Sequence, residues 1–203
     1  TAIGSRIPGE LLPPLGHLMI GGPLLDAGHH VTLLNADIAP LSDAEILAQL
    51  KADGPDAVLI GHSGSTSAHP TVLRLAALIR AALPKVWIVY GGVYPSYHWA
   101  EVLAESPAID VILRGEGETT TPRLIAALSR GDDLGGVPGL AYRRDGRPVS
   151  SPPASMSRDL DQTRTGWELV DLSKHSYWGG KRAVVMQFSR GCPHLCTYCG
   201  QRG

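Results

Sequence analysis

The chain has 203 residues, a formal net charge of −1 and 43% hydrophobic residues, enough to bury a core in one or two domains. The near-zero charge provides no electrostatic attraction to nucleic acid or anionic lipid. No apolar run approaches the ~20 residues that a membrane span requires. Composition and charge therefore argue against a nucleic-acid-binding or membrane-spanning protein.

The two ends of the chain look like cuts in a longer sequence. The chain starts without Met in the loop-like segment TAIGSRIPGE, and it stops four residues after Cys199. We therefore expect part of a longer protein, with the first strand of its domain upstream of Thr1.

Strand and helix patterns alternate along the first two thirds of the chain. Short β-branched runs at 31–35, 57–62, 86–90 and 109–113 predict parallel strands that are buried on both faces. This alternation predicts a doubly wound, Rossmann-like α/β domain with a mostly parallel sheet. The helical patterns cover residues 15–29, 42–54, 69–83 and 119–131.

Local sequence signals favour the second helix and are mixed for the first. Ser42 and Glu45 form the sequence pattern of a capping box at the start of the second helix. Gly28 is a suitable C′ residue for the first helix, but Gly21, Gly22 and Pro23 inside that helix oppose it.

The pattern changes near residue 135. Residues 139–153 read as a hairpin, with Asp145 and Gly146 in the tight turn. The apolar run 183–188 then predicts a second buried strand that leads directly into a cysteine-rich loop. We divide the chain into a first domain (1–135), a linker with the hairpin (136–182) and the beginning of a second domain (183–203).

All three cysteines lie in one short loop, at positions 192, 196 and 199. Clustered thiols without partners elsewhere favour a reducing compartment, so we expect a cytoplasmic protein. Three thiolates at these spacings can hold one soft metal centre, and an iron–sulfur cluster bound by three leaves one iron open. The alternative is a zinc site with His194 as fourth ligand, although that histidine sits in a cramped position.

The segment Cys192-x-x-x-Cys196-x-Tyr198-Cys199, preceded by a predicted strand, resembles the signature of the radical S-adenosyl-L-methionine (SAM) enzymes. The resemblance implies that the three cysteines hold a [4Fe-4S] cluster, with Tyr198 beside the cofactors and SAM on the open iron. It also implies a TIM-type barrel, and an electron donor such as a reduced flavodoxin or ferredoxin. Cleavage of SAM would then supply a radical that removes hydrogen from the substrate.

Glycine and small polar residues follow three of the predicted strands, at 61–66, 91–95 and 114–118. Parallel sheets bind ligands outside the carboxyl ends of their strands, and glycine lets a bulky ligand approach the backbone. Such loops often contain glycine without any ligand, but three at one sheet edge favour a shared ligand. The candidate binding residues are Gly61, His62, Ser63, Ser65, Thr66, Gly91, Gly92, Val93, Tyr94, Gly115, Glu116 and Gly117.

These loops, followed by the cysteine motif, resemble the cobalamin-binding domain of the B12-dependent radical SAM enzymes. The resemblance implies a cobalamin over the sheet edge, with its tail near Gly91 and Gly92. No Asp-x-His-x-x-Gly motif occurs, so the histidine that ligates cobalt in mutase-type domains is absent. His62 could replace it, or could be a hydrogen-bonded structural residue, so we assign no lower axial ligand.

The segments HSGSTSAHP and GGVYPSYHW are similar to the anaerobic oxidative cyclases of this family, which act on magnesium-protoporphyrin IX monomethyl ester. The resemblance implies a small-molecule porphyrin substrate and closure of the isocyclic ring of bacteriochlorophyll without dioxygen. Two alternatives remain open: a B12-dependent radical SAM methyltransferase, and a non-catalytic corrinoid or iron–sulfur module.

Overall fold

The computed structural model describes residues 11–36, 40–62, 66–177, 180–192, 194 and 197. A five-stranded sheet with the order β1-β2-β3-β4-β5 forms its centre. The strands are β1 (Ala57–Ile60), β2 (Trp87–Gly91), β3 (Val111–Leu113), β4 (Leu140–Arg144) and β5 (Arg147–Ser150). The α-helices are α1 (Leu15–Asp26), α2 (Asp43–Asp53), α3 (His69–Ala82), α4 (Val93–Tyr97), α5 (Trp99–Glu105) and α6 (Thr120–Arg130). Short 3-10 helices are η1 (Thr66–Ala68), η2 (Leu134–Gly136), η3 (Leu160–Gln162), η4 (Trp167–Leu169) and η5 (Leu172–Lys174).

The first three strands are parallel and in register, which brings their carboxyl ends to one edge of the sheet. Ile60 pairs with Tyr90, and Gly91 pairs with Leu113. The predicted hairpin is confirmed: β4 and β5 pair antiparallel through a turn in which Asp145 has a φ of 52°. Because β4 pairs with β3, the sheet continues past residue 135.

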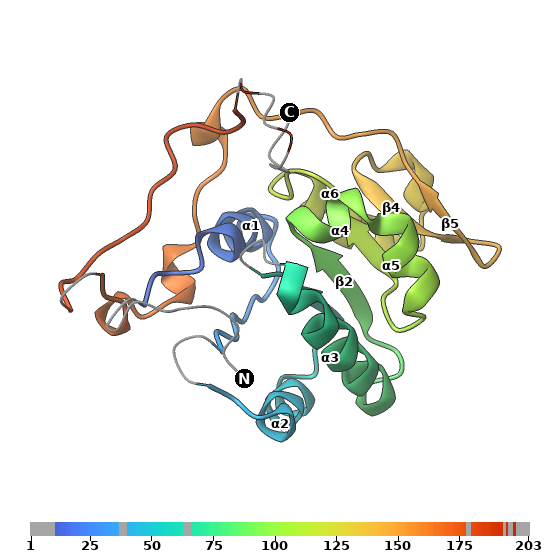
Figure 1. Ribbon diagram of the computed structural model, residues 1–203, viewed down its shortest axis with the longest axis horizontal. Helices are drawn as coiled ribbons and strands as arrows, with labels where there is room; N and C mark the ends of the chain where they lie inside the picture. The colour runs from blue at the N-terminus through green and yellow to red at the C-terminus, as the bar shows by residue number, and fades with distance from the viewer. Residues whose placement is uncertain are drawn as a thin grey trace.

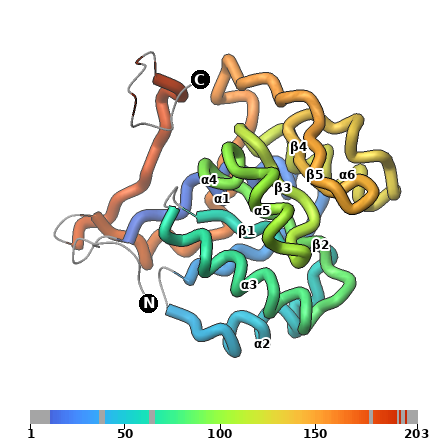
Figure 2. The backbone as a smooth tube through the Cα atoms, turned by 45° about the vertical axis from the view of Figure 1, so that its right-hand side comes forward, coloured from blue at the N-terminus to red at the C-terminus, as the bar shows by residue number. Residues whose placement is uncertain are grey.

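Helices cover both faces of the sheet, which confirms the predicted doubly wound α/β fold (Figure 1). On one face, α3 and α5 bury Val72 and Val102 against the side chains of β2, with α2 packed beside α3. On the other face, α6 buries Leu124 against Val89 and Val111, and α1 packs against α6. Figure 2 shows α2 and α3 lying along one side of the sheet and α6 near the hairpin.

Both helices with local signals in the sequence, α2 and α1, form in the structure. The Ser42–Glu45 capping box is formed, with both reciprocal hydrogen bonds present. Helix α1 forms in spite of its glycines because the chain after the hairpin passes directly against them. A Cβ on Gly22 would collide with the Arg164 carbonyl oxygen, and one on Gly166 would lie 2.8 Å from the Gly22 nitrogen. The glycines permit this close backbone approach.

Two predicted strands are wrong. Residues 31–35 form no strand, because no described strand lies at the outer edge of β1 to pair with them. Residues 183–188 form none either: Val184, Met186 and Phe188 are exposed, and the segment runs apart from the sheet in both views (Figures 1 and 2). An apolar run becomes a buried strand only where another strand or helix covers it. Within the described ranges, every helix falls short of the length and hydropathy that a membrane span requires.

Candidate functional site

The candidate loops lie together at the carboxyl edge of the sheet. Gly61 and His62 follow β1, Gly92 follows β2, and the segment 114–117 follows β3. Gly92 has a φ of 116° and Gly115 a φ of 77°, a region that residues with a Cβ rarely adopt. At this edge a Cβ on Gly115 would meet nothing within 4 Å, whereas a Cβ on Gly61 would lie 3.0 Å from Nε2 of His17.

Ser96 joins two of these loops. Its hydroxyl donates a hydrogen bond of 2.8 Å to the Gly92 carbonyl oxygen, and accepts one of 3.0 Å from the Gly115 amide. The first and second loops also approach closely, since a Cβ on Gly92 would lie 3.6 Å from the His62 carbonyl oxygen. Ser96 thus ties the loops after β2 and β3 together, and the loop after β1 lies next to them.

A buried aromatic cluster underlies the first loop. The Nε2 atom of His62 lies 2.8 Å from the hydroxyl of Tyr90, and Nδ1 of His69 lies 3.4 Å from the same hydroxyl. Tyr90 is fully buried, and His69 is 7% exposed. The ring of His69 also packs against Tyr94, whose centroid is 4.5 Å away, and Tyr94 in turn stacks on His98.

Burial controls the protonation of this cluster. Removal from solvent lowers the pKa of His62, and the neighbouring His69 and His17 lower it further. Burial likewise raises the pKa of Tyr90 above its ordinary value. His62 is therefore neutral and Tyr90 protonated near neutral pH. Within the described residues, Nδ1 of His62 is buried without a hydrogen-bond partner.

Arg190 attaches the segment before the cysteines to the third loop. Its guanidinium lies 3.1 Å from Glu116 and 2.5 Å from Glu118, and it also contacts the sulfur of Met19 on α1 at 3.4 Å. The side chains of Arg190, Glu116 and Glu118 are only 17%, 23% and 13% exposed. Burial lowers the pKa of Arg190, but its bonds to the two carboxylates outweigh this and raise it.

Cys192, the first residue of the predicted cluster motif, lies two positions after Arg190 and is exposed with a free thiol. Among the described residues, no group of three or more metal-ligating side chains gathers. Several predicted site residues lie outside the described part of the chain. These are Ser63, Ser65, Cys196, Tyr198 and Cys199.

The other predicted residues differ in what they offer to a ligand. Val93 and Thr66 are exposed, whereas Tyr94 packs its ring within the aromatic cluster. Glu116 is occupied, because it accepts a 2.6 Å hydrogen bond from the Ser157 amide in addition to the Arg190 contact. Gly117 is packed against Ile20, 3.0 Å from the position of a Cβ.

Sequence reasoning missed the residues that connect the loops. Ser96 carried a weak signal, since it stands four residues after the glycine pair, at the spacing of a serine that bonds back to its own helix. The sequence pattern places Tyr90 in a strand and His69 in a helix, and it contains no sign of a contact between them. Arg190 gave no local signal of its partners, which lie more than 70 positions earlier.

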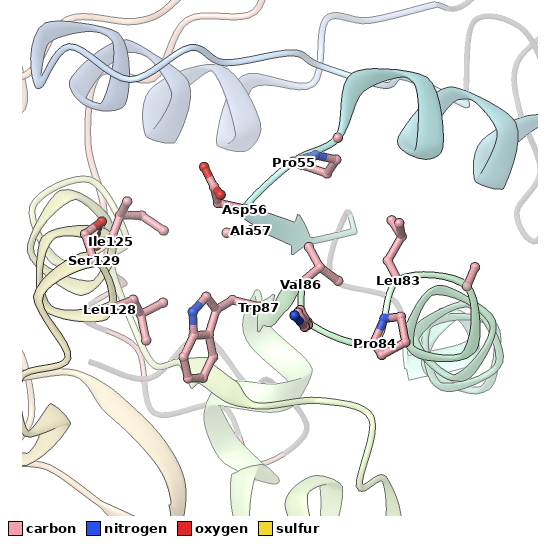
Figure 3. Close-up of a pocket in the computed structure, with 13 residues that line it drawn as sticks. Pro55, Asp56, Ala57, Leu83, Pro84, Val86, Trp87, Ile125, Leu128 and Ser129 are labelled. Carbon is pink, nitrogen blue, oxygen red and sulfur yellow. Dashed lines mark hydrogen bonds between the residues drawn. The ribbon is translucent and has the colours of Figure 1, made fainter.

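A cavity lies at the opposite edge of the sheet. It has a volume of about 670 Å³, and Figure 3 shows Pro55 and Asp56 before β1, Ala57 at the start of β1, Trp87 on β2 and Leu128 on α6 around it. These are the amino ends of the strands, where parallel sheets seldom bind ligands. The second cavity, of about 300 Å³, includes Glu116, Glu118 and Arg190 and so borders the candidate site.

Comparison with known proteins matches residues 5–125 to the B12 binding domain family. The chain is 62% identical over 202 residues to the anaerobic magnesium-protoporphyrin IX monomethyl ester cyclase of Synechocystis, covering 100% of this chain and 40% of that protein. It is 30% identical over 196 residues to an uncharacterized methyltransferase of Pyrococcus horikoshii, covering 96% of this chain and 42% of that protein.

Among solved structures, the radical SAM methyltransferase TsrM from Kitasatospora setae, with cobalamin and a [4Fe-4S] cluster bound, has a TM-score of 0.71 to this chain. The sequences are 19% identical, and the alignment covers 97% of this chain and 40% of TsrM. The likeness shows a shared fold. The chain spans about 40% of the length of these two curated relatives.

Proposed function

Because the chain belongs to the B12 binding domain family, we propose that it holds a cobalamin at the carboxyl edge of its sheet, as part of an anaerobic magnesium-protoporphyrin IX monomethyl ester cyclase. The single observation that carries the cyclase assignment is the 62% identity to the Synechocystis enzyme along the whole chain. In this proposal the complete protein builds the isocyclic ring of (bacterio)chlorophyll. It acts on a porphyrin substrate and receives electrons from an electron donor.

The described residues fit a corrinoid at this edge. Gly92 and Gly115 leave the backbone uncovered where a flat, bulky ligand needs to approach. Beside them, Nδ1 of His62 is a buried polar atom without a partner among the described residues, which a ligand atom could satisfy. We propose that the loops after β1, β2 and β3 hold the ligand and that Ser96 keeps two of them aligned.

The cysteine segment fits an iron–sulfur cluster by the chemistry of its donors. Cys192 offers an exposed thiol, and Cys196 and Cys199 follow at the spacing of the radical SAM motif. We propose that these three cysteines hold a [4Fe-4S] cluster with SAM, beside Tyr198. The bound cluster supplies the electron for reductive cleavage of SAM.

The chain's own residues have three tasks in this proposal. The glycine loops bind the corrinoid, Cys192 and the cysteines that follow it hold the cluster, and Arg190 keeps the cysteine segment beside the loop after β3. Arg190 therefore sets the distance between the two cofactor-binding segments.

The proposal is tested with the chain extended to the length of its relatives and reconstituted without oxygen. We expect magnesium-protoporphyrin IX monomethyl ester to become the five-ring product while SAM is consumed. A Cys192→Ala variant should lose both reactions and the cluster absorbance, because the motif holds the cluster by three thiolates and has no fourth cysteine to replace Cys192. Five-ring product without SAM consumption would contradict the proposal.

The second candidate is a cobalamin-dependent methyltransferase. It is supported by the 30% identity to the Pyrococcus methyltransferase over 196 residues and by the fold shared with TsrM. The same reaction separates the two candidates, because a methylated product without a new ring would favour the methyltransferase.

A further inference from the structure

Four side chains form a continuous polar path from the protein surface to the first loop of the candidate site. Glu105, at the end of α5, is 62% exposed, and its carboxylate lies 3.6 Å from Nε2 of His69. Nδ1 of His69 lies 3.4 Å from the Tyr90 hydroxyl, which lies 2.8 Å from Nε2 of His62. The path ends at Nδ1 of His62, which is buried and has no partner in the described part of the chain.

The Glu105 carboxylate favours one direction of the protons along this path. The 3.6 Å separation is too long for a strong hydrogen bond, but the negative charge of Glu105 favours an N–H over a lone pair on the facing Nε2 of His69. Nδ1 of His69 is then an acceptor, and the single hydroxyl proton of Tyr90 points to it. The Tyr90 oxygen must therefore accept from His62, whose Nε2 carries the proton.

The opposite arrangement places two acceptors against each other. If Tyr90 donated to His62, its oxygen would need to accept from Nδ1 of His69, and the lone pair of His69 Nε2 would face the Glu105 carboxylate. Electrostatic repulsion disfavours that state.

The consequence appears at the far end of the path. With the proton on Nε2, the buried Nδ1 of His62, two positions after the end of β1, carries a lone pair. A buried acceptor without a donor is destabilising, and a donor supplied by a ligand would remove that cost. A corrin ring carries primary carboxamides around its rim, and these offer N–H donors of the required kind.

We propose that Glu105, His69 and Tyr90 hold His62 in the Nε2–H form, so that its Nδ1 accepts a hydrogen bond from a carboxamide of the bound ligand. The carboxamide contact rests on the proposed binding of cobalamin, whereas the proton arrangement does not. His62 is a binding residue in this account, and Tyr90, His69 and Glu105 are positioning residues.

The proton arrangement is tested first, by ¹⁵N NMR of the histidine-labelled chain without any ligand, with a His62→Gln variant to assign the signals. We expect the Nε2–H form of His62 in the unaltered chain. Glu105→Lys replaces the acceptor by a donor and should reverse the whole path, leaving the proton of His62 on Nδ1. Glu101→Lys, on the same exposed side of α5, is the matched control and should change nothing. An Nδ1–H form in the unaltered chain, or no reversal in Glu105→Lys, would overturn the arrangement.

The ligand contact is tested by titration with cobalamin. Glu105→Lys and Tyr90→Phe should each weaken binding by about 3- to 10-fold, the value of one net hydrogen bond, while Glu101→Lys binds as the unaltered chain does. If the unaltered chain binds cobalamin and both variants bind equally well, the carboxamide contact is wrong and the proposed function stands. If the unaltered chain binds none, the proposed function fails and the contact with it, while the NMR result still decides the proton arrangement.

The paramagnetic resonance spectrum of bound Co(II) cobalamin gives a further test. A splitting from a histidine nitrogen that disappears in His62→Gln would assign the lone pair of His62 to cobalt. That result would overturn the carboxamide contact.

Discussion

Arg190 bonds Glu118 at 2.5 Å across 72 positions of sequence. The contact joins the segment that leads into the cysteines to the loop after β3, and Glu116 strengthens it from the same loop. Because all three side chains are largely buried, each charge depends on its partners. The arrangement makes Arg190 the attachment point between the two proposed cofactor sites.

Replacement of Arg190 by Ala should release this segment. Hydrogen bonds to charged groups contribute about 1.5–3 kcal/mol, and partial exposure reduces that value, so we expect roughly tenfold faster limited proteolysis within residues 183–192. Arg182→Ala is the control, because Arg182 is exposed on the same segment. Equal cleavage rates in the two variants would show that Arg190 does not hold the segment.

Ser96→Ala should loosen the candidate site without unfolding the chain. The Gly115 amide loses its acceptor, so the loops after β2 and β3 are no longer tied, and we expect cobalamin affinity to fall by about 3- to 10-fold. Ser129→Ala removes a similar hydroxyl that bonds back to its own helix at Ile125, and should leave binding unchanged. Identical losses in both variants would count against a bridging role for Ser96.

Much of the fold follows from local sequence signals. The capping box at Ser42 and the hairpin turn at Asp145 formed as predicted, because each depends on residues within a few positions of one another. The apolar runs at 31–35 and 183–188 failed as strands because hydrophobicity indicates a tendency toward burial but not the presence of a pairing partner.

The candidate site was predicted as three loops but not as a connected unit. Glycine after a strand is a local signal, so Gly92 and Gly115 could be identified from the sequence. The contacts of Arg190 with Glu118 and of His69 with Tyr90 join elements that are distant along the chain. No pattern of spacing identifies such pairs, because the fold alone determines which elements meet.

Gly92→Ala should destabilise the chain and weaken ligand binding together. A φ of 116° is unfavourable for any residue with a Cβ, so we expect a loss of about 1–3 kcal/mol in the free energy of unfolding, measured by urea denaturation. Gly16→Ala is the control, since a Cβ there meets nothing within 4 Å. A Gly92→Ala chain as stable as the control would contradict the argument from backbone geometry.

Stability should fall in mild acid because of His62. Burial lowers its pKa in the folded chain from the ordinary 6.5, with His69 and His17 contributing. As the pH falls through about 6.5, the unfolded chain takes up a proton at this position before the folded chain does, so the unfolded state gains stability. His62→Gln should reduce the loss of stability between about pH 7.5 and pH 5, whereas His30→Gln, at an exposed position, should not. The same pH dependence in the His62→Gln chain and the unaltered chain would argue against it.

The central claim is that cobalamin binds at the carboxyl edge of the sheet, and calorimetric titration with cobalamin tests it most directly. Gly91→Ile adds bulk at the end of β2 without requiring a left-handed backbone, and Lys85→Trp fills the cavity at the opposite edge. The account predicts that the unaltered chain and Lys85→Trp bind one cobalamin, while Gly91→Ile binds none. Binding that survives Gly91→Ile and is lost in Lys85→Trp would contradict the account, as would an unaltered chain that takes up no cobalamin.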